Sequence, residues 1–254
     1  MDQVYLPKNR NGFNIGDYVI LKPLEEKKFI KKPYFYDVKN IEPIKLEIIK
    51  EIISIIDSLA TNENIIISGS FLDKGFNFRD IDVIIIGEDK VDERYIKNSI
   101  ENKIKIKTHI ISLDNKTLIK GLSTDPLYQL LLSKCIAKKR FVYKLEYRIN
   151  YKILDLHLLK SKLLIDSFDM LDGNEKYYLV RNIIAISLYL KKKKIDTEKV
   201  DKEIRKVFNL KSTNEIKQNI LEKDKFLKKY KKIYENTFEK IMQGIKNAKQ
   251  KKVD

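Results

Sequence analysis

The clearest pattern of apolar and polar positions is the run IIISGSFLDKGFNFRDIDVIIIGE, which occupies residues 65–88. Four consecutive β-branched residues at 83–86 are typical of a strand that is covered on both faces. The apolar residues 65–67 predict a preceding strand, which ends in a glycine-bearing turn at residues 68–70. Before this strand, apolar positions at helical spacing predict a helix over residues 43–59, with a proline in its first turn.

After this region the pattern becomes mainly helical. A helix is predicted over residues 91–101, and the alternation in KIKIKTHIIS at 103–112 predicts a third strand. No convincing strand follows Asp125. Four further stretches predict helices, namely PLYQLLLSKCIAKK, INYKILDLHLLKSKLLIDSF, EKYYLVRNIIAISLYL and a lysine-rich run over residues 213–250. The third of these is apolar almost all round, which is typical of the central helix of a bundle.

The predicted fold is therefore α+β, with a small mixed or antiparallel sheet flanked by helices and an all-helical C-terminal domain. We expect an N-terminal extended or hairpin segment at residues 1–41, a sheet-containing core at 42–120 and a basic helical domain at 121–254. In the first segment, apolar residues 18–21 between two glycine-bearing turns predict a strand.

Composition excludes several classes of protein. A chain of 254 residues with 43% hydrophobic residues can bury a substantial core. No stretch approaches the roughly 20 apolar residues of a membrane-spanning helix. The first residues lack the apolar stretch of a signal peptide, so we expect a cytoplasmic protein. The single cysteine, Cys135, excludes an internal disulfide, and we expect it to be a core-packed thiol on a helix.

The net charge of +16 is distributed unevenly. Residues 1–120 carry 20 Lys and Arg against 19 Asp and Glu, whereas residues 121–254 carry 32 against 17. This asymmetry favours a polyanion-binding surface in the second half over a merely solvated lysine-rich surface. Tyr143, Tyr147 and Tyr151 alternate with basic side chains there, and they can either stack on bases or pack the bundle. The candidate nucleic-acid-binding residues are Arg140, Lys144, Arg148 and Lys152.

Two carboxylates open the strand at 83–86. Asp80 and Asp82 point to the same side because strand side chains alternate, which places their Cα atoms about 6.6 Å apart. Two like charges at the edge of a core repel each other and resist desolvation. A divalent cation, Mg²⁺ or Mn²⁺, is the usual reason why a protein tolerates this arrangement.

The spacing of these aspartates from the preceding turn resembles a known signature. Gly69-Ser70 follows a strand, and after nine residues Asp80-Ile81-Asp82 leads the next strand. This pattern resembles the DNA polymerase β nucleotidyltransferase superfamily over roughly residues 42–112. Gly75 resembles a second glycine that is often found in the intervening loop. In such folds a mixed or mostly antiparallel sheet is flanked by helices, and a helical domain often follows.

The resemblance implies transfer of a nucleoside monophosphate from an NTP to a hydroxyl acceptor, with release of pyrophosphate. Asp80 and Asp82 would be the catalytic, metal-binding residues. Gly69 and Ser70 would bind phosphate oxygens through backbone N–H groups and a hydroxyl. The loop cations that either contact the triphosphate or remain solvated are Lys74 and Arg79. The basic second half favours RNA, such as a tRNA end, as acceptor. Relatives in the superfamily also modify proteins and small molecules such as aminoglycosides.

The sequence departs from the family pattern at the third carboxylate, which family members usually place on the next strand. That strand, KIKIKTHIIS, has none, and Lys105, Lys107 and His109 share the side where it is expected. Asp114 lies just beyond the strand and would reach back only loosely. The alternatives are two aspartates with water-completed metals, a ligand from His109 or elsewhere, or a degenerate site. His109 would be a soft ligand for Mg²⁺, and we expect a partly buried strand histidine.

Two further residues have open roles. Arg181 is a charge inside an apolar helix, so it either faces a cleft and meets a nucleotide phosphate or pairs with a carboxylate such as Asp155 or Asp166. We expect His157 to be a packed or surface helix histidine rather than a catalyst. The alternative to an active enzyme is a degenerate, non-catalytic nucleotidyltransferase-fold module. Such a module would bind nucleic acid or a protein partner, for example in a toxin–antitoxin pair.

Overall fold

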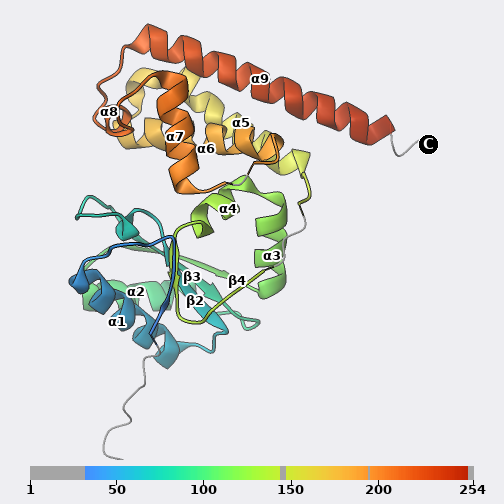
Figure 1. Cartoon of the computed structure of the whole chain (residues 1–254). Helices are drawn as coiled ribbons and strands as arrows, with labels where there is room; N and C mark the ends of the chain where they lie inside the picture. Colours follow the sequence, from blue (N-terminus) through green and yellow to red (C-terminus); the bar gives the residue numbers. More distant parts are fainter. Residues whose placement is uncertain (1–31, 144–146, 194, 251–254) are drawn as a thin grey trace, which may run out of the picture. The chain divides into compact units, whose positions relative to one another are not determined.

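The computed structural model describes residues 32–143, 147–193 and 195–250. The strand expected at residues 18–21 lies outside this part of the chain. The described residues form a five-stranded sheet with the order β1-β5-β2-β3-β4. Figure 1 labels three of these strands, β2, β3 and β4. All neighbouring strands are antiparallel except β3 and β4, which are parallel. The strands are β1 (Tyr34–Tyr36), β2 (Asn64–Ser68), β3 (Ile81–Ile86), β4 (Thr108–Leu113) and β5 (Cys135–Ala137).

Helices cover both faces of the sheet, as the β-branched runs predict. Helices α1 (Pro43–Leu59) and α2 (Glu93–Ile104) pack on one face, in a cluster rich in isoleucine. On the other face, Ile84 and Ile86 pack in a cluster with residues of α3 (Asn115–Thr124) and α4 (Pro126–Leu132). Asp82 has the same parity along β3 as Ile84, so it points to the face that α3 and α4 cover.

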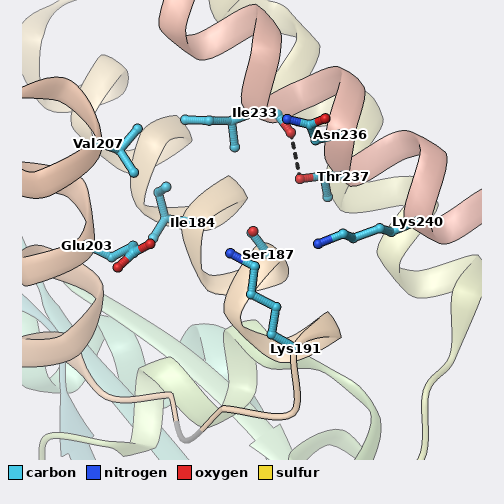
Figure 2. Close-up of a pocket in the computed structure, with 9 residues that line it drawn as sticks. All are labelled: Ile184, Ser187, Lys191, Glu203, Val207, Ile233, Asn236, Thr237 and Lys240. Carbon is cyan, nitrogen blue, oxygen red and sulfur yellow. Dashed lines mark hydrogen bonds between the residues drawn. The ribbon is translucent and has the colours of Figure 1, made fainter.

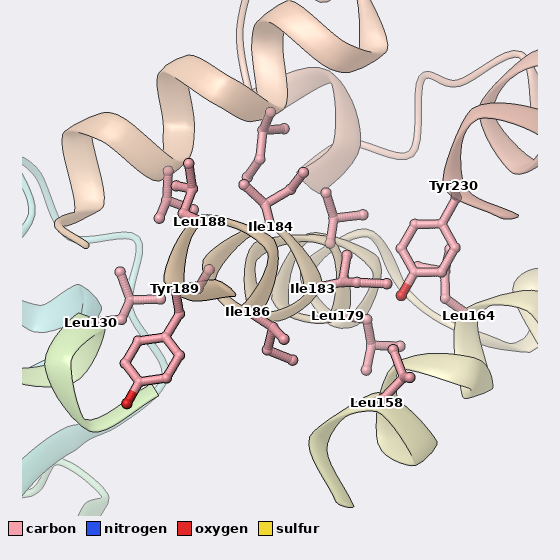
Figure 3. Close-up of a cluster of buried hydrophobic side chains, with 14 of the residues drawn as sticks. Leu130, Leu158, Leu164, Leu179, Ile183, Ile184, Ile186, Leu188, Tyr189 and Tyr230 are labelled. Carbon is pink, nitrogen blue, oxygen red and sulfur yellow. The ribbon is translucent and has the colours of Figure 1, made fainter. Parts of the chain in front are cut away.

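The rest of the described chain is helical. Helix α6 packs against α4, α5, α7, α8 and α9, as expected for a central helix. Figure 3 shows its apolar side chains directed into neighbouring helices on several sides. No helix among the described residues is long and apolar enough to cross a membrane. The helices are α5 (Tyr151–Asp166), α6 (Gly173–Leu190), α7 (Thr197–Phe208), α8 (Asn214–Lys217) and α9 (Lys223–Gln250), with a short 3-10 turn, η2 (Phe168–Met170), after α5.

The expectation that no strand follows Asp125 is wrong. Residues 135–137 form β5 between β1 and β2, so the sheet-containing core extends beyond residue 121. Cys135 accordingly lies in a strand rather than a helix. It is fully buried, as expected, and burial raises the pKa of its thiol to about 12. A three-residue strand is too short for an alternating pattern to reveal it.

Several other elements also differ from the sequence expectation. The strand expected at 103–112 begins only at Thr108, because α2 continues to Ile104 and Lys105 caps it with a left-handed φ of 59°. Lys105 and Lys107 therefore do not share a strand face with His109. The lysine-rich run at 213–250 is two helices, α8 and α9, and the sequence pattern predicts neither α3 nor α7.

Tyr189 ties the central helix to the segments that connect it to the sheet. Its side chain is fully buried, and its hydroxyl lies 2.9 Å from both Ser123 O and Arg148 O, to which it donates. These two carbonyl groups belong to the end of α3 and to the segment before α5. The hydroxyl thus fixes α6 against two parts of the chain that are distant in sequence.

Replacing Tyr189 by Phe removes this donor while the volume of the ring remains. We expect the free energy of unfolding to fall by about 1–3 kcal/mol, since two carbonyl groups lose a buried partner. Urea denaturation followed by circular dichroism measures the change. Tyr95→Phe is the matched control, because Tyr95 is exposed on α2. Equal stability of Tyr189→Phe and the control would contradict this role.

Candidate active site

The turn after β2 places the backbone of Gly69 against Asp82. The antiparallel register pairs Ser68 with Asp82. Gly69 has φ 84° and ψ −169°, a combination that is essentially restricted to glycine. A Cβ at this position would lie 2.2 Å from Asp82 Oδ2. Glycine is therefore required both by the backbone turn and by the approach of the carboxylate. Ser70 follows at the start of the 3-10 turn η1 (Ser70–Leu72).

Asp80 and Asp82 line the same cleft as Gly69 and Ser70, and its volume is about 570 Å³. Ile81 between them is fully buried, so the alternation expected from the sequence is present. Asp80 is exposed, whereas the side chain of Asp82 is only 28% exposed. Burial, and secondarily the charge of Asp80, raises the pKa of the Asp82 carboxyl. A cation in the cleft would stabilise the ionised form.

His109 occupies the position where the family resemblance implies a third carboxylate. Parallel pairing of β3 and β4 sets His109 beside Asp82, and Nδ1 lies 3.3 Å from Asp82 Oδ1. The His109 side chain is exposed rather than partly buried, because β4 is an edge strand. Asp114 does not reach back toward Asp82. It lies at the other end of β4, where it caps α3 by accepting a hydrogen bond from Thr117 N.

A buried lysine holds the loop that joins η1 to Asp80. Lys45 Nζ, on α1, donates hydrogen bonds to the carbonyl groups of Asp73 and Gly75 and lies 3.2 Å from Glu42 Oε2. Glu42 accepts a hydrogen bond from the N–H of Gly75, which lowers the pKa of Glu42 to about 2. Three aromatic rings lie 5.4–5.6 Å from the ammonium group, those of Phe71, Phe76 and Phe78. The loop between η1 and Asp80 is therefore held in place by Lys45 and Glu42.

The two loop cations proposed from the sequence lie in different environments. Lys74 is exposed and lines no part of the cleft. Arg79 Nη2 donates to Asp172 Oδ2 at 2.7 Å, and Asp172 caps the N-terminus of α6. This pair is largely exposed, so it contributes little stability. Arg79 remains at the mouth of the cleft, beside Asp80.

Helix α6 supplies a wall of the cleft through Tyr178, Arg181 and Asn182. Their spacing of three and four residues places them on one side of the helix. Arg181 makes no ion pair with Asp155 or Asp166, and its Nε is buried without a hydrogen-bond partner among the described residues. The charge of Arg181 acts on Asp82 by favouring its ionised form. An incompletely bonded guanidinium in a cleft is suited to an anion.

A carboxylate–histidine pair lies in the same cleft. His157 Nε2, on α5, is 3.0 Å from both carboxylate oxygens of Asp125, which also caps α4 by accepting from Leu127 N. The side chains are only 17% and 10% exposed, respectively. His157 is therefore a partly buried helix histidine that contacts a carboxylate. Sequence reasoning missed the partnership because the two residues are brought together by tertiary packing alone.

An apolar extension of the cleft opens beside Asp80. It has a volume of about 830 Å³ and shares six lining residues with the polar part, namely Ser70, Asp80, Tyr177, Tyr178, Arg181 and Lys217. Its additional apolar lining comes from Phe78, Leu159, Leu163, Leu171 and Leu179. An apolar surface with a few charged groups at one end is suited to a ligand with a flat or apolar portion next to phosphates.

The candidate nucleic-acid residues lie elsewhere. Arg140, Arg148 and Lys152 are exposed but line neither part of the cleft, and Lys144 lies outside the described residues. The neighbouring tyrosines favour the packing alternative. The ring of Tyr147 packs at a tilt against the ring of Tyr189, with 4.4 Å between the ring centroids. The hydroxyl of Tyr143 donates to Asn115, and Tyr151 packs against the helical core.

A separate hollow of about 350 Å³ lies between α6, α7 and α9. Figure 2 shows Lys191 and Lys240 extending toward it, with the carboxylate of Glu203 on another wall. Thr237, also in the lining, donates its hydroxyl proton to Ile233 O at 2.7 Å (Figure 2). None of the residues selected from the sequence lines this hollow, so the polar cleft is the candidate active site.

The side chains that line the cleft supply only some of the ligands that a hard cation such as Mg²⁺ needs. Asp80, Asp82 and His109 are the residues that could hold a metal. Among the described residues, no three carboxylate, histidine or cysteine side chains form a complete metal-binding group. Mg²⁺ is commonly held by one or two carboxylates together with substrate phosphates and water. Two aspartates therefore suffice for a metal that arrives with a nucleotide.

Comparison of the chain with protein-family models, with curated proteins and with solved structures finds no match.

Gly69→Ala tests the contact between the turn and Asp82. The new methyl group requires a disfavoured φ and collides with the carboxylate, so we expect unfolding free energy to fall by more than about 2 kcal/mol. Gly75→Ala is the matched control, since Gly75 also has a positive φ of 83° but no atom lies within 4 Å of its would-be Cβ. It should lose only the backbone-strain component, about 1–2 kcal/mol. Equal losses, measured by denaturant titration, would contradict the steric role of Asp82.

The raised pKa of Asp82 predicts a pH-dependent stability difference. The folded state favours the protonated carboxyl of Asp82. The stability that this protonated group contributes is present below pH 3.8 and is lost as the pH rises through the raised pKa of the folded state. Asp82→Asn removes this loss, so the variant should gain stability relative to wild type as pH increases from 3 to 7. Thermal unfolding in the presence of EDTA measures the difference. The exposed Asp89→Asn is the control, and a parallel response of both variants would contradict the effect of burial.

Proposed function

We propose that the protein is a metal-dependent nucleotidyltransferase of the DNA polymerase β type. The observation that carries the proposal is that Asp80 and Asp82 line one cleft with the Gly69-Ser70 turn and with Arg181, whose Nε lacks a hydrogen-bond partner in the described part of the chain. Paired carboxylates, a glycine turn and a free guanidinium donor are the groups that a metal-bound triphosphate requires. The substrate would be an NTP with Mg²⁺ or Mn²⁺.

Each residue has a defined role in this proposal. Asp80 and Asp82 hold the metal, which when bound neutralises phosphate charge and favours ionisation of the acceptor hydroxyl. The backbone at Gly69 and the hydroxyl of Ser70 bind phosphate oxygens. Arg181 stabilises the charge that develops on the triphosphate as the α-phosphate is attacked and pyrophosphate leaves. The apolar extension beside Asp80 accommodates the nucleobase or part of the acceptor.

The position of His109 favours a second candidate function. A neutral imidazole in the place of a carboxylate weakens metal binding by two aspartates, as expected of a degenerate site. The chain would then be a non-catalytic module that binds nucleic acid or a protein partner. We favour the enzyme, because a non-catalytic module has no need for a partly buried carboxylate with a raised pKa beside an incompletely bonded arginine.

RNA remains the favoured acceptor on the grounds of charge in the second half of the chain. The cleft itself is nearly balanced, since its two parts combine several basic side chains with several carboxylates. The basic lining residues are Arg79, Lys134, Lys160, Arg181 and Lys217, and the acidic ones are Asp73, Asp80, Asp82, Asp125 and Glu175. Any strong phosphate-backbone contact would therefore be made outside the cleft, where Arg140, Arg148 and Lys152 lie.

Incubation with labelled NTPs, Mg²⁺ and total RNA tests the function. We expect label transfer that EDTA abolishes and that Asp82→Asn lowers by at least about 100-fold, because the metal loses a ligand. Arg181→Ala should lower transfer by about 100–1,000-fold, as for the loss of a transition-state donor. The exposed Arg94→Ala should retain full activity. RNA binding without label transfer or pyrophosphate release would favour the non-catalytic module.

A further inference from the structure

The carboxylate–histidine pair of the cleft has no role in binding the nucleotide as described above. Asp125 and His157 come from α4 and α5, and they line the same cleft as Asp80 and Asp82. One explanation for a buried pair of this kind is that it merely joins two helices. Two observations indicate a further use. The pair lies in the cleft, and within the described part of the chain only one of the two ring nitrogens of His157 is hydrogen-bonded.

The geometry fixes the proton on one nitrogen of His157. Nε2 lies 3.0 Å from both oxygens of Asp125, so an ionised Asp125 requires the proton on Nε2. Asp125 is itself held by the N–H of Leu127 at 2.8 Å. Nδ1 of His157 has no hydrogen-bond partner among the described residues and therefore carries a free lone pair in the neutral ring. A histidine oriented by a carboxylate, with its second nitrogen free, is the arrangement of a general base.

A second polar group in the cleft also lacks a partner. Asn182, on α6, is only 5% exposed, and its side-chain amide makes no hydrogen bond with any described residue. Its Oδ1 is buried, and rotation about χ2 would exchange oxygen and nitrogen at the surface of the cleft. A buried amide without a partner is costly, so a ligand group that bonds to it is favoured.

We propose that Asp125, His157 and Asn182 form the acceptor subsite, in which His157 is the general base. The acceptor would carry two adjacent hydrogen-bonding groups, as in a vicinal diol. One hydroxyl gives its proton to His157 Nδ1, and the adjacent group bonds to Asn182. The deprotonated oxygen forms a bond to the α-phosphorus of the NTP as the bond to the pyrophosphate oxygen breaks. The proton on His157 is then released to water.

This assignment rests on the proposed nucleotidyltransferase function, and it explains how the reaction proceeds without a third carboxylate. In it, His109 remains beside Asp82 at the metal site and is not required to accept the proton. A vicinal diol occurs at the 3′ end of RNA and in the sugar rings of aminoglycosides. The two sources share the same chemistry, so the test includes both.

The test compares transfer from labelled ATP to two probes, an RNA oligonucleotide with a 3′-terminal ribose and kanamycin. For whichever probe accepts label, we expect His157→Ala to lower kcat by about 100-fold or more while the KM for ATP stays constant. Free imidazole should restore part of the activity of His157→Ala. Asp125→Asn should lower kcat similarly, because the tautomer of His157 is no longer fixed. Asp155→Asn, an exposed carboxylate on the same helix as His157, is the control for loss of a charge.

The role of Asn182 is tested with acceptors that lack the hydroxyl next to the reacting one. Oligonucleotides with a 3′-terminal ribose or 2′-deoxyribose should differ about tenfold in kcat/KM with wild type and be equivalent with Asn182→Ala. For kanamycin, the corresponding comparison uses a derivative that lacks one hydroxyl next to the modified position. An unchanged preference in Asn182→Ala would overturn its role.

The outcomes separate this subsite from the proposed function. If Asp82→Asn abolishes transfer but both His157→Ala and His157→Gln stay within threefold of wild-type kcat, the enzyme stands and the acceptor subsite is wrong. The same holds if ATP is hydrolysed to AMP and pyrophosphate in an Asp82-dependent manner while neither probe accepts label. If wild type neither transfers nor releases pyrophosphate, the proposed function fails and the subsite fails with it. Unfolding curves of each variant identify a loss of activity that is due to misfolding, and imidazole rescue then decides the role of His157.

Discussion

The Asp82 carboxylate lies directly against the backbone of Gly69, and the arrangement of the cleft follows from this contact. The β2–β3 register pairs Ser68 with Asp82, so the carboxylate stands where the chain must leave the sheet. Only a residue without Cβ leaves room for it. The following loop is anchored by Lys45, whose ammonium group binds two loop carbonyl groups from within a cluster of aromatic rings. The loop therefore returns the chain to Asp80 in a defined conformation.

The helical half of the protein completes the cleft through a small number of polar contacts. Asp125 and His157 join α4 to α5, and Tyr189 joins α6 to the end of α3 and to the segment before α5. Helix α6 thereby holds Arg181 and Asn182 in the cleft, and most of its other residues from Leu179 to Tyr189 are buried. A polar side chain on a buried helix costs free energy unless it meets a partner. Arg181 Nε and Asn182 Oδ1, which lack a partner among the described residues, thus support the proposal that the cleft binds a polar ligand.

Much of the sheet-containing core could be predicted because its patterns are local. The β-branched runs at β2 and β3 and the helical spacing in α1 are readable within single segments. The apolar pattern of α1 does not reveal the anchoring role of Lys45, although this residue lies four residues before Ile49 and thus on the apolar face of the helix. β5 could not be predicted, since three residues gain strand structure only through pairing with distant segments. The partners of Asp125 and Arg79 likewise come from residues that are distant in sequence, and no pattern along the chain connects them.

The charge asymmetry that the sequence suggests does not reside in the cleft. Helix α9 alone carries nine lysines, yet none of its residues whose side chains are described lines either part of the cleft. The cleft instead combines cations with carboxylates in similar numbers, which suits a metal-bound triphosphate and a neutral, hydroxyl-bearing acceptor group better than a long polyanion. Electrostatic attraction to nucleic acid falls off within about 10 Å at moderate salt, so lysines outside the cleft act on the approach of a partner rather than on the reacting atoms. Recognition of a large acceptor and chemistry on its hydroxyl would therefore belong to separate surfaces of the same chain.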